Sequence, residues 1–460
     1  MEITMSSQST ENSIDTEAAE AKFKLMTESK VESLILKLAF PTIVSMLITS
    51  IYNMADTFFV GQIGTSATGA VGVVFPLMAI IQAVGFFFGH GAGNFISRKL
   101  GAKQLDEANE MASTGFFSAL IGGCVIMVCG LLFTDPLARL LGATDTILPY
   151  ARQYLRIIVC GAPYMTASLT LNNQLRFQGN AFYAMLGIGA GGILNIVLDP
   201  ILIFGLDMGT GGAALATIIS QFVSFIVLFI GVTHKGIPIR FRNFKPNRYY
   251  LKEITRGGIP SLFRQGCASV ATVCLNQMAG VYGADAAIAA MSIVQRITMF
   301  AASALIGYGQ GFQPVCGFNY GAKRTDRVKR GFWFCVKSSF LVLLVLAILG
   351  GVFAPQIIAF FRKDDAAVIE IGAFALRMQC ITFPLTGYVV MCNMMAQTIG
   401  ESVKATILAM SRQFLFFVPS LLVLSALMGL TGVEISQTVS DGFSFVVSVA
   451  VGYSILRKWK

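Results

Sequence analysis

The pattern of glycines in this chain occurs twice, with the second copy about 220 residues after the first. In each copy a Gly-x-Gly-x-Gly run precedes a Gly-Ala-Lys sequence, and isolated prolines and glycines match as well. The matching pairs are Gly89-His-Gly91-Ala-Gly93 with Gly307-Tyr-Gly309-Gln-Gly311, Gly101-Ala102-Lys103 with Gly321-Ala322-Lys323, Pro41 with Pro260, Gly64 with Gly283, Pro163 with Pro384, and Gly179 with Gly400. A repeat of this length predicts two halves with the same fold.

The composition predicts that both halves lie in a lipid bilayer. Of the 460 residues, 55% are hydrophobic and only 13% are charged, whereas a soluble globular protein has about 25% charged residues. Because so few charges cannot cover a surface that faces water, we expect a polytopic membrane protein. The net charge of +10 is explained by Lys and Arg in cytoplasmic loops, so we expect no nucleic-acid partner.

About twelve apolar segments are long enough to cross ~30 Å of hydrocarbon. They lie roughly at 34–60, 66–97, 113–133, 150–173, 181–205, 211–233, 257–281, 286–314, 332–353, 366–397, 404–428 and 433–456. The predicted fold is therefore all-α and integral to the membrane, with two pseudo-symmetric six-helix bundles. We expect a disordered cytoplasmic tail at 1–30 without a signal peptide, an N-lobe at 31–233, a cytoplasmic linker at 234–256 and a C-lobe at 257–460.

Basic residues predict how the chain is oriented. The loops after even-numbered spans contain most of the Lys and Arg, including Arg176 and the run at 234–256, and the chain ends Arg457-Lys-Trp-Lys460. Both termini are therefore expected in the cytoplasm, on the inner side of the plasma membrane. With an even number of spans per copy, the two lobes enter the membrane from the same side. Parallel repeats with glycines and prolines inside their spans are typical of secondary transporters.

The residues that could support catalysis or hold a metal are scarce. The nine cysteines lie in or beside apolar segments and form no Cys-x-x-Cys pair, and only two histidines occur, His90 and His234. We therefore expect no metal centre, no organic cofactor and no enzyme active site. The glycine runs lie inside spans with no preceding strand, so they favour close helix packing or local bending over a dinucleotide-binding loop.

Two carboxylates lie inside the predicted spans of the first copy, Asp56 and Asp199. Each ionisable group in a bilayer costs roughly 2.5–3.5 kcal/mol, so each needs a reason. Asn195 precedes Asp199 by four residues and shares its helix face. Given the direction of each span, Tyr154 and Thr217 fall at a similar depth in the outer half of the membrane. This set predicts a site for Na⁺ or H⁺; the alternative is that the two acids are separate structural residues, Asp199 serving the backbone groups freed by Pro200.

The second copy does not repeat these acids. Leu275 stands opposite Asp56, and Val418 stands opposite Asp199. Its spans contain instead Arg264, Arg296, Arg377 and Asp441. We expect Asp441 to form a buried ion pair with one of these arginines, rather than a second coupling site. The other arginines are expected to face a central cavity or to bind backbone carbonyls.

Several motifs together resemble the multidrug and toxic compound extrusion (MATE) transporters. They are Asn53-Met-Ala-Asp56-Thr-Phe-Phe-Val-Gly61 with Pro41 in the first span, Gly211-Gly-Ala-Ala-Leu-Ala-Thr217 at the start of the sixth, and Gly309-Gln-Gly311-Phe-Gln-Pro314 before Gly317-Phe-Asn-Tyr-Gly-Ala-Lys323. The last run resembles the bacterial DinF-like and MepA-like branch. The resemblance covers roughly residues 31–456.

The resemblance implies efflux of drugs or other toxic organic compounds in exchange for H⁺ or Na⁺, by alternating access in a monomer. It also implies an ion site at Asp56, Tyr154, Asn195, Asp199 and Thr217, with Na⁺ on four of these if sodium is the ion, and helix bending at Pro41. The NorM-like branch has acids in the seventh and tenth spans, where this chain has Arg264 and Arg377. A flippase for a lipid-linked, phosphate-bearing precursor is the alternative, since it would use an arginine-lined cavity.

Overall fold

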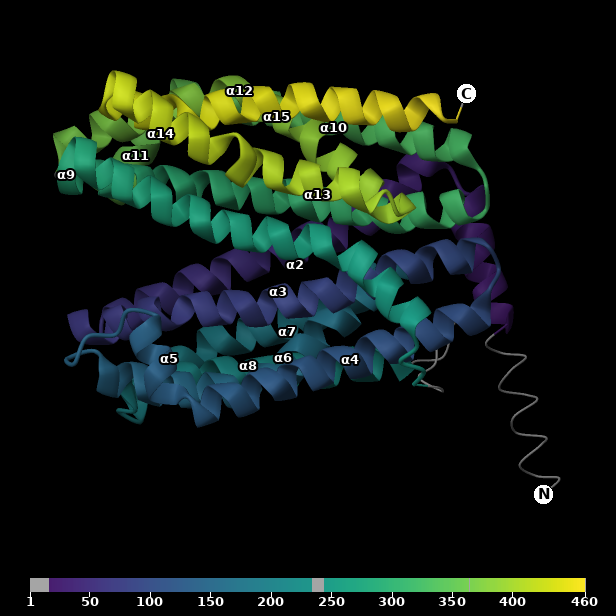
Figure 1. The fold of residues 1–460 in the computed structure, drawn as a ribbon, viewed down its shortest axis with the longest axis horizontal. Helices are drawn as coiled ribbons and strands as arrows, with labels where there is room; N and C mark the ends of the chain where they lie inside the picture. The colour runs from purple at the N-terminus through teal and green to yellow at the C-terminus, as the bar shows by residue number, and fades with distance from the viewer. Residues whose placement is uncertain (1–15, 234–243, 364, 460) are drawn as a thin grey trace.

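Two bundles of long helices lie side by side in the computed structural model, which describes residues 16–233, 244–363 and 365–459, apart from the side chains of 65–68. The first bundle runs from purple to teal and the second from teal to yellow (Figure 1). All regular elements in the described ranges are helices. The predicted all-α membrane fold with two lobes is confirmed.

The N-lobe and the C-lobe have matching series of helices. The N-lobe contains α2 (Val31–Gly61), α3 (Thr65–Gly101), α4 (Leu105–Leu132), the short α5 (Thr134–Leu140), α6 (Leu148–Phe177), α7 (Ala181–Pro200) and α8 (Gly209–Thr233). The C-lobe contains α9 (Arg248–Gly321), α10 (Thr325–Val352), the short α11 (Ala354–Phe361), α12 (Ala366–Ile399), α13 (Ser402–Met410), α14 (Phe417–Met428) and α15 (Leu430–Arg457). The short helices α5 and α11 lie where loops were expected.

The described helices account for the predicted spans. Ten of them are long and apolar enough to cross a membrane. One of these, α9, contains the two predicted spans 257–281 and 286–314, joined at a kink where Ala284 has φ 50° and ψ −152°. The remaining predicted span, 150–173, lies in α6, whose 30 residues include many buried polar side chains and so make it less apolar than its neighbours.

The fifth and eleventh spans share an irregularity that the sequence did not predict. A π-helical turn over Ile201–Gly205 follows α7, and another over Ser411–Leu415 joins α13 to α14. In the N-lobe the turn begins directly after Pro200, which has no backbone N–H to donate to the regular helical ladder. Wide turns of this kind are frequent at functional sites, because they redirect the side chains beside them.

The repeated glycines bring the two lobes into contact. A Cβ on Gly101 would collide with the carbonyl of Phe318, and one on Gly321 would collide with the carbonyl of Arg98. Gly91 is equally close to the backbone of Ile254 in α9. The expectation of close helix packing is confirmed, and at Gly91, Gly101 and Gly321 the packing lies between the lobes.

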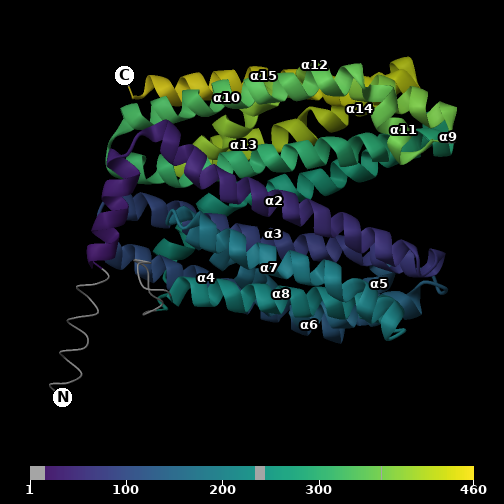
Figure 2. The same cartoon turned by 180° about the vertical axis from the view of Figure 1, so that it is seen from behind.

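Both described ends of the chain lie at the same end of the bundles, which we call the basal end; the other is the distal end (Figures 1 and 2). A charged contact joins the lobes there. Arg98 of α3 donates from Nη1 to the Thr398 carbonyl at 2.8 Å and pairs through Nη2 with Glu253 of α9 at 3.1 Å. The lobes are therefore tied together at the basal end by both packing and charge.

The expected boundaries are wrong at two places. Residues 16–28 form a helix instead of a disordered tail, and α9 begins at Arg248, inside the segment expected to be a linker. Residues 1–15 and 234–243, on which parts of these expectations fall, lie outside the described residues. The helix at 16–28 is ordered because its last carbonyls accept hydrogen bonds from the C-lobe.

Candidate functional site

The five polar residues expected to bind the coupling ion come from four helices of the N-lobe. Asp56 lies on α2, Tyr154 on α6, Asn195 and Asp199 on α7, and Thr217 on α8. Asn195 Nδ2 donates to Asp199 Oδ1 at 3.3 Å. Asp56 interacts electrostatically with Asp199, and both carboxylates interact with Tyr154, whose hydroxyl lies beside Thr217. The structure thus brings the five residues together.

This cluster is buried and lacks a positive partner. Asp199 is 0% exposed, and Tyr154, Asn195 and Thr217 are also buried, while Asp56 is half-buried. Asp56 Oδ1 and Asp199 Oδ2 are shielded from solvent without a hydrogen-bond donor. No Lys or Arg in the described ranges forms an ion pair with either carboxylate. Two adjacent buried acids of this kind need a cation or a proton.

Close packing of α2 on α7 places Asp56 near Asp199. A Cβ on Gly192 would lie 2.7 Å from Ile48 and 3.2 Å from the Tyr52 ring, so only glycine permits this approach. Asp56 follows Tyr52 by one helical turn, and Asp199 follows Asn195 by one turn. The glycines of α7 therefore determine the separation between the two helices that carry the acids.

The cluster offers oxygen atoms of the kind that Na⁺ and H⁺ use. Carboxylates, a side-chain amide and hydroxyls are hard ligands, which suit a small hard cation. No group of three or more His, Cys, Asp or Glu suitable for a metal ion occurs in the part of the chain that the structure describes. If sodium is the ion, the oxygen atoms available to it are those of Asp56, Asn195, Asp199 and Thr217.

Pro41 lies in the basal half of α2, between two residues that contact the C-lobe. On the basal side of the helix, Thr42 Oγ1 donates to the Gly307 carbonyl of the C-lobe at 2.6 Å, and Ala39 packs against Gly311. Further along, the same helix packs on α7 of its own lobe. A proline removes one backbone hydrogen bond and allows a helix to bend at that point.

Asp441 forms the expected buried ion pair, but with a different partner. Arg412 pairs with it through Nε–Oδ1 at 2.8 Å and Nη2–Oδ2 at 3.4 Å. Gln437 Nε2 also donates to Asp441 Oδ1, at 2.8 Å. The expectation that Arg264, Arg296 or Arg377 would be the partner is wrong. Arg412 could have been recognised in the sequence as a charged residue inside the predicted span 404–428. The structure places it in the π-helical turn of that span.

The three arginines predicted to be important in the C-lobe have different environments. Arg296 is exposed on α9, and Arg377 is exposed on α12, where its Nε donates to the Gly351 carbonyl at 3.2 Å. Arg264 is half-buried and interacts electrostatically with Arg176 and His90 of the N-lobe. Only for Arg377 does the expected binding to a backbone carbonyl appear among the described contacts.

Arg176 was assigned to a basic loop, yet it is 2% exposed in the last turn of α6. Its Nη2 donates to Asn173 Oδ1 at 2.6 Å and lies 3.4 Å from His90 Nε2. His90 Nδ1 is 3.2 Å from the Phe86 carbonyl, which fits a neutral imidazole that donates from Nδ1 and accepts at Nε2. Loop charge statistics cannot distinguish such a buried arginine from an exposed one.

The comparisons of this chain with known proteins agree with one another. The MatE family model matches residues 41–201 and 260–423. The multidrug export protein MepA of Staphylococcus haemolyticus is 29% identical over 434 residues, which are 94% of this chain and 95% of that protein. MepA of Staphylococcus aureus is 28% identical over 429 residues, covering 93% of this chain and 94% of the relative.

Two solved structures match over nearly the whole chain. One is an outward-facing multidrug resistance MATE transporter of the MOP superfamily, with TM-score 0.90 and 29% identity, covering 95% of this chain and 98% of that one. The other is a MOP-superfamily transporter from Pyrococcus furiosus, described as having a binding pocket of reversed polarity that suggests a different function. It has TM-score 0.88, 30% identity and the same coverage.

Proposed function

Because this chain belongs to the MatE family of multidrug and toxic compound extrusion transporters, we propose that it exports small organic compounds across a membrane in exchange for H⁺ or Na⁺. Members of this family are transporters and not enzymes. The observation that carries the exchange is the buried pair Asp56 and Asp199, which has unsatisfied carboxylate oxygens and no basic partner among the described residues. A proton or a sodium ion would neutralise that pair.

Helix α2 supplies the physical link between ion binding and movement of the lobes. It contains Asp56 near its distal end and contacts the C-lobe through Thr42, next to Pro41, and through Ser50, which lies between Pro41 and Asp56. An ion that neutralises Asp56 changes how α2 packs on α7, and this change reaches the contact with α9. To drive transport, the ion must bind the two states of the protein with different affinities.

We propose that the described conformation is open at the distal end and closed at the basal end. Support comes from Arg98, which is tied to Glu253 and to the Thr398 carbonyl, and from the backbone contacts of Gly101 and Gly321. The similarity to an outward-facing transporter agrees with this assignment. The basal end then faces the cytoplasm and the protein lies in a plasma membrane, as the basic loops predict.

Transport in proteoliposomes tests this function directly. Purified protein is reconstituted, a proton or sodium gradient is imposed separately, and uptake of a fluorescent organic cation such as ethidium is recorded. Wild-type protein should respond to one gradient. Asp56→Asn and Asp199→Asn should each abolish gradient-driven uptake, because the amide cannot carry the charge or the proton.

Asp145→Asn provides the matched control. Asp145 is exposed beyond α5 and pairs only with Arg139 among the described residues, so its variant removes one carboxylate without touching the cluster. The control should transport like wild type. Undiminished gradient-driven uptake by either cluster variant, at equal reconstituted amounts, would exclude the pair as the coupling site.

The flippase alternative required a cavity lined by the C-lobe arginines. Of the three residues, Arg377 alone lines the C-lobe cavity of about 730 Å³, and it shares that cavity with Glu370 and Glu434. A phosphate group would be repelled by those two carboxylates. This observation favours export of organic compounds over transfer of a phosphate-bearing lipid.

A further inference from the structure

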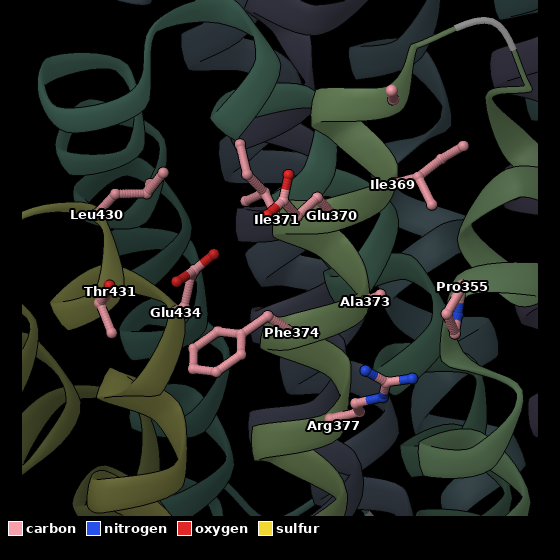
Figure 3. Close-up of a pocket in the computed structure, with 11 residues that line it drawn as sticks. Pro355, Ile369, Glu370, Ile371, Ala373, Phe374, Arg377, Leu430, Thr431 and Glu434 are labelled. Atoms are coloured by element: carbon pink, nitrogen blue, oxygen red, sulfur yellow. The ribbon is translucent and has the colours of Figure 1, made fainter.

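A cavity of about 730 Å³ lies at the distal end of the C-lobe, away from the acidic cluster of the N-lobe. It is formed by α11, α12 and the first turns of α15 (Figure 3). Its polar and aromatic lining residues are Glu370, Phe374, Arg377, Thr431 and Glu434. Pockets that bind small molecules usually have volumes of about 300–1,000 Å³, so this one has room for an organic ligand.

Glu434 is the residue that distinguishes this cavity from an ordinary depression in the protein surface. The residue is only 6% exposed, and its carboxylate is directed toward Glu370 across the cavity (Figure 3). The two carboxylates interact electrostatically. No hydrogen bond or ion pair to Glu434 occurs in the described part of the chain. A buried acid that faces a second acid without a partner is stabilised by a cation.

The acid is specific to the C-lobe, although its surroundings repeat. Gly212 of α8 packs against the Leu202 carbonyl, and Gly432 of α15 packs in the same way against the Leu424 carbonyl, so the two glycines are equivalent. Two residues beyond Gly212 the N-lobe has Ala214, whereas the C-lobe has Glu434. Close packing of the helices therefore does not require the carboxylate, and another reason for it is needed.

The other walls of the cavity suit the body of an organic cation. Phe374 lies between the glutamates and Arg377, and Ile371 and Leu430 add apolar surface (Figure 3). An aromatic ring stabilises an adjacent cation and packs on apolar groups. The guanidinium of Arg377 points away from Glu434, and its Nε is occupied by the Gly351 carbonyl at 3.2 Å, so it does not neutralise the acids.

We propose that this distal cavity is a binding site for monovalent organic cations with an aromatic or aliphatic body, separate from the N-lobe cluster. The cationic group lies between Glu370 and Glu434, and the apolar body rests against Phe374. The site opens at the distal end and needs no ion coupling, so its occupancy does not depend on whether Asp56 and Asp199 drive transport. It provides a place where cations gather beside the transport pathway.

Equilibrium binding of tetraphenylphosphonium tests the site in purified full-length protein. The measurements use the Asp56→Asn/Asp199→Asn background, so that the N-lobe acids contribute no charge. Glu434→Gln, which keeps the shape of the side chain, should raise the Kd about tenfold or more, and Glu370→Gln should raise it by a smaller factor because Glu370 is exposed. Thr431→Trp fills the cavity without changing its charge, so this variant should abolish binding.

Asp145→Asn and Arg377→Gln serve as matched controls. The first removes an exposed distal charge outside the cavity and should leave the Kd unchanged, while the second should leave it unchanged or lower it. Equal Kd values for the background protein and folded Glu434→Gln would overturn the proposal. So would a loss of affinity in Asp145→Asn as large as in Glu434→Gln, since that would indicate general attraction to surface charge. Failure of gradient-driven transport in wild type would affect only the coupling mechanism.

Discussion

At the scale of single residues, the repeat preserves backbone conformations that only glycine adopts easily. Gly179 and Gly400 have φ of 79° and 88° and end equivalent helices, α6 and α12. A residue with a Cβ costs about 1–2 kcal/mol in this left-handed region. The match between these two positions in the sequence therefore reflects a turn that both lobes need.

Gly400→Ala should lower stability by about 1–2 kcal/mol through this backbone strain. Its nearest neighbour would be the Arg98 Nη1 at 3.5 Å, so steric collision adds little. The control is Gly442→Ala, inside α15 with nothing within 4 Å of the added Cβ, which should be neutral or stabilising by about 0.5–1 kcal/mol. Thermal unfolding of the two variants in one detergent checks this, and equal shifts would contradict it.

The ion pair of Arg412 with Asp441 is a second residue-scale feature. Removing one partner of a buried pair leaves an uncompensated charge, so Arg412→Met should cost about 3–5 kcal/mol of unfolding free energy. The double variant Arg412→Met/Asp441→Leu should recover most of that loss, because no buried charge remains. Denaturant unfolding of the single and double variants measures the coupling. A double variant as unstable as the single one would mean that the pair is not energetically coupled.

At the scale of elements, the helix at 16–28 acts as a clamp across the basal end. Its terminal carbonyls accept hydrogen bonds from the C-lobe: Met26 from Asn319 at 2.9 Å, Thr27 from Arg324 at 2.7 Å, and Ser29 from Arg327. Such carbonyls have no partner within their own helix, and positive groups are favoured near them. On the N-lobe side, Lys22 Nζ donates to Asn180 Oδ1 at 2.7 Å.

The clamp has a predicted dependence on pH. Burial lowers the pKa of Lys22 to about 8 from 10.5. A detached helix keeps the ordinary pKa and binds the proton more tightly, so docking should strengthen as the pH rises from about 8 to 10.5. Neutral Lys22 still donates to Asn180. Lys22→Met should weaken docking and remove the pH dependence.

Spin labels at the exposed Glu20 and Gln104 measure this docking, in protein whose exposed cysteines Cys129 and Cys160 are replaced by alanine. A narrow distance distribution at pH 9.5 and a broader one at pH 7 are expected for native Lys22. The same distribution at both pH values would contradict the assignment to Lys22, and an opposite trend would show that the protonated form is the docked one.

In the molecule as a whole, the two lobes can move relative to each other only if the contacts between α2 and α9 change. One such contact links Ser50 Oγ of α2 to Ser303 Oγ of α9 at 2.9 Å. The basal contacts around Gly101 and Gly321 join the lobes as well, between the end of α3 and the end of α9. Alternating access requires these contacts to part in the other state.

Cross-linking the lobes should therefore stop transport. In Ser50→Cys/Ser303→Cys, oxidation should form a disulfide that abolishes gradient-driven ethidium uptake, and a reductant should restore it. Ser50→Cys alone is the control, since it cannot form this bridge. Mass spectrometry of the linked peptides identifies the bond among the nine native cysteines. Full uptake by fully cross-linked protein would show that this interface stays closed throughout transport.

The architecture follows from the amino-acid sequence alone. The length of each apolar segment, the repeat and the charge distribution are local properties, and they predicted two helical lobes and the membrane spans. Direction and depth along the spans also predicted which polar residues lie at a similar height: Asp56, Tyr154, Asn195, Asp199 and Thr217. These predictions succeed because a helix of known start and direction fixes the height of every residue along it.

Which faces of the helices meet depends on the three-dimensional packing of the chain. It selected Arg412 as the partner of Asp441, buried Arg176 against His90, directed Glu434 into a cavity and placed the basal half of α2 against the opposite lobe. Height along a span is encoded locally, whereas the rotation of a helix and its neighbours depends on packing among segments far apart in the chain. That is why charge type and depth were predictable, but the partners were not.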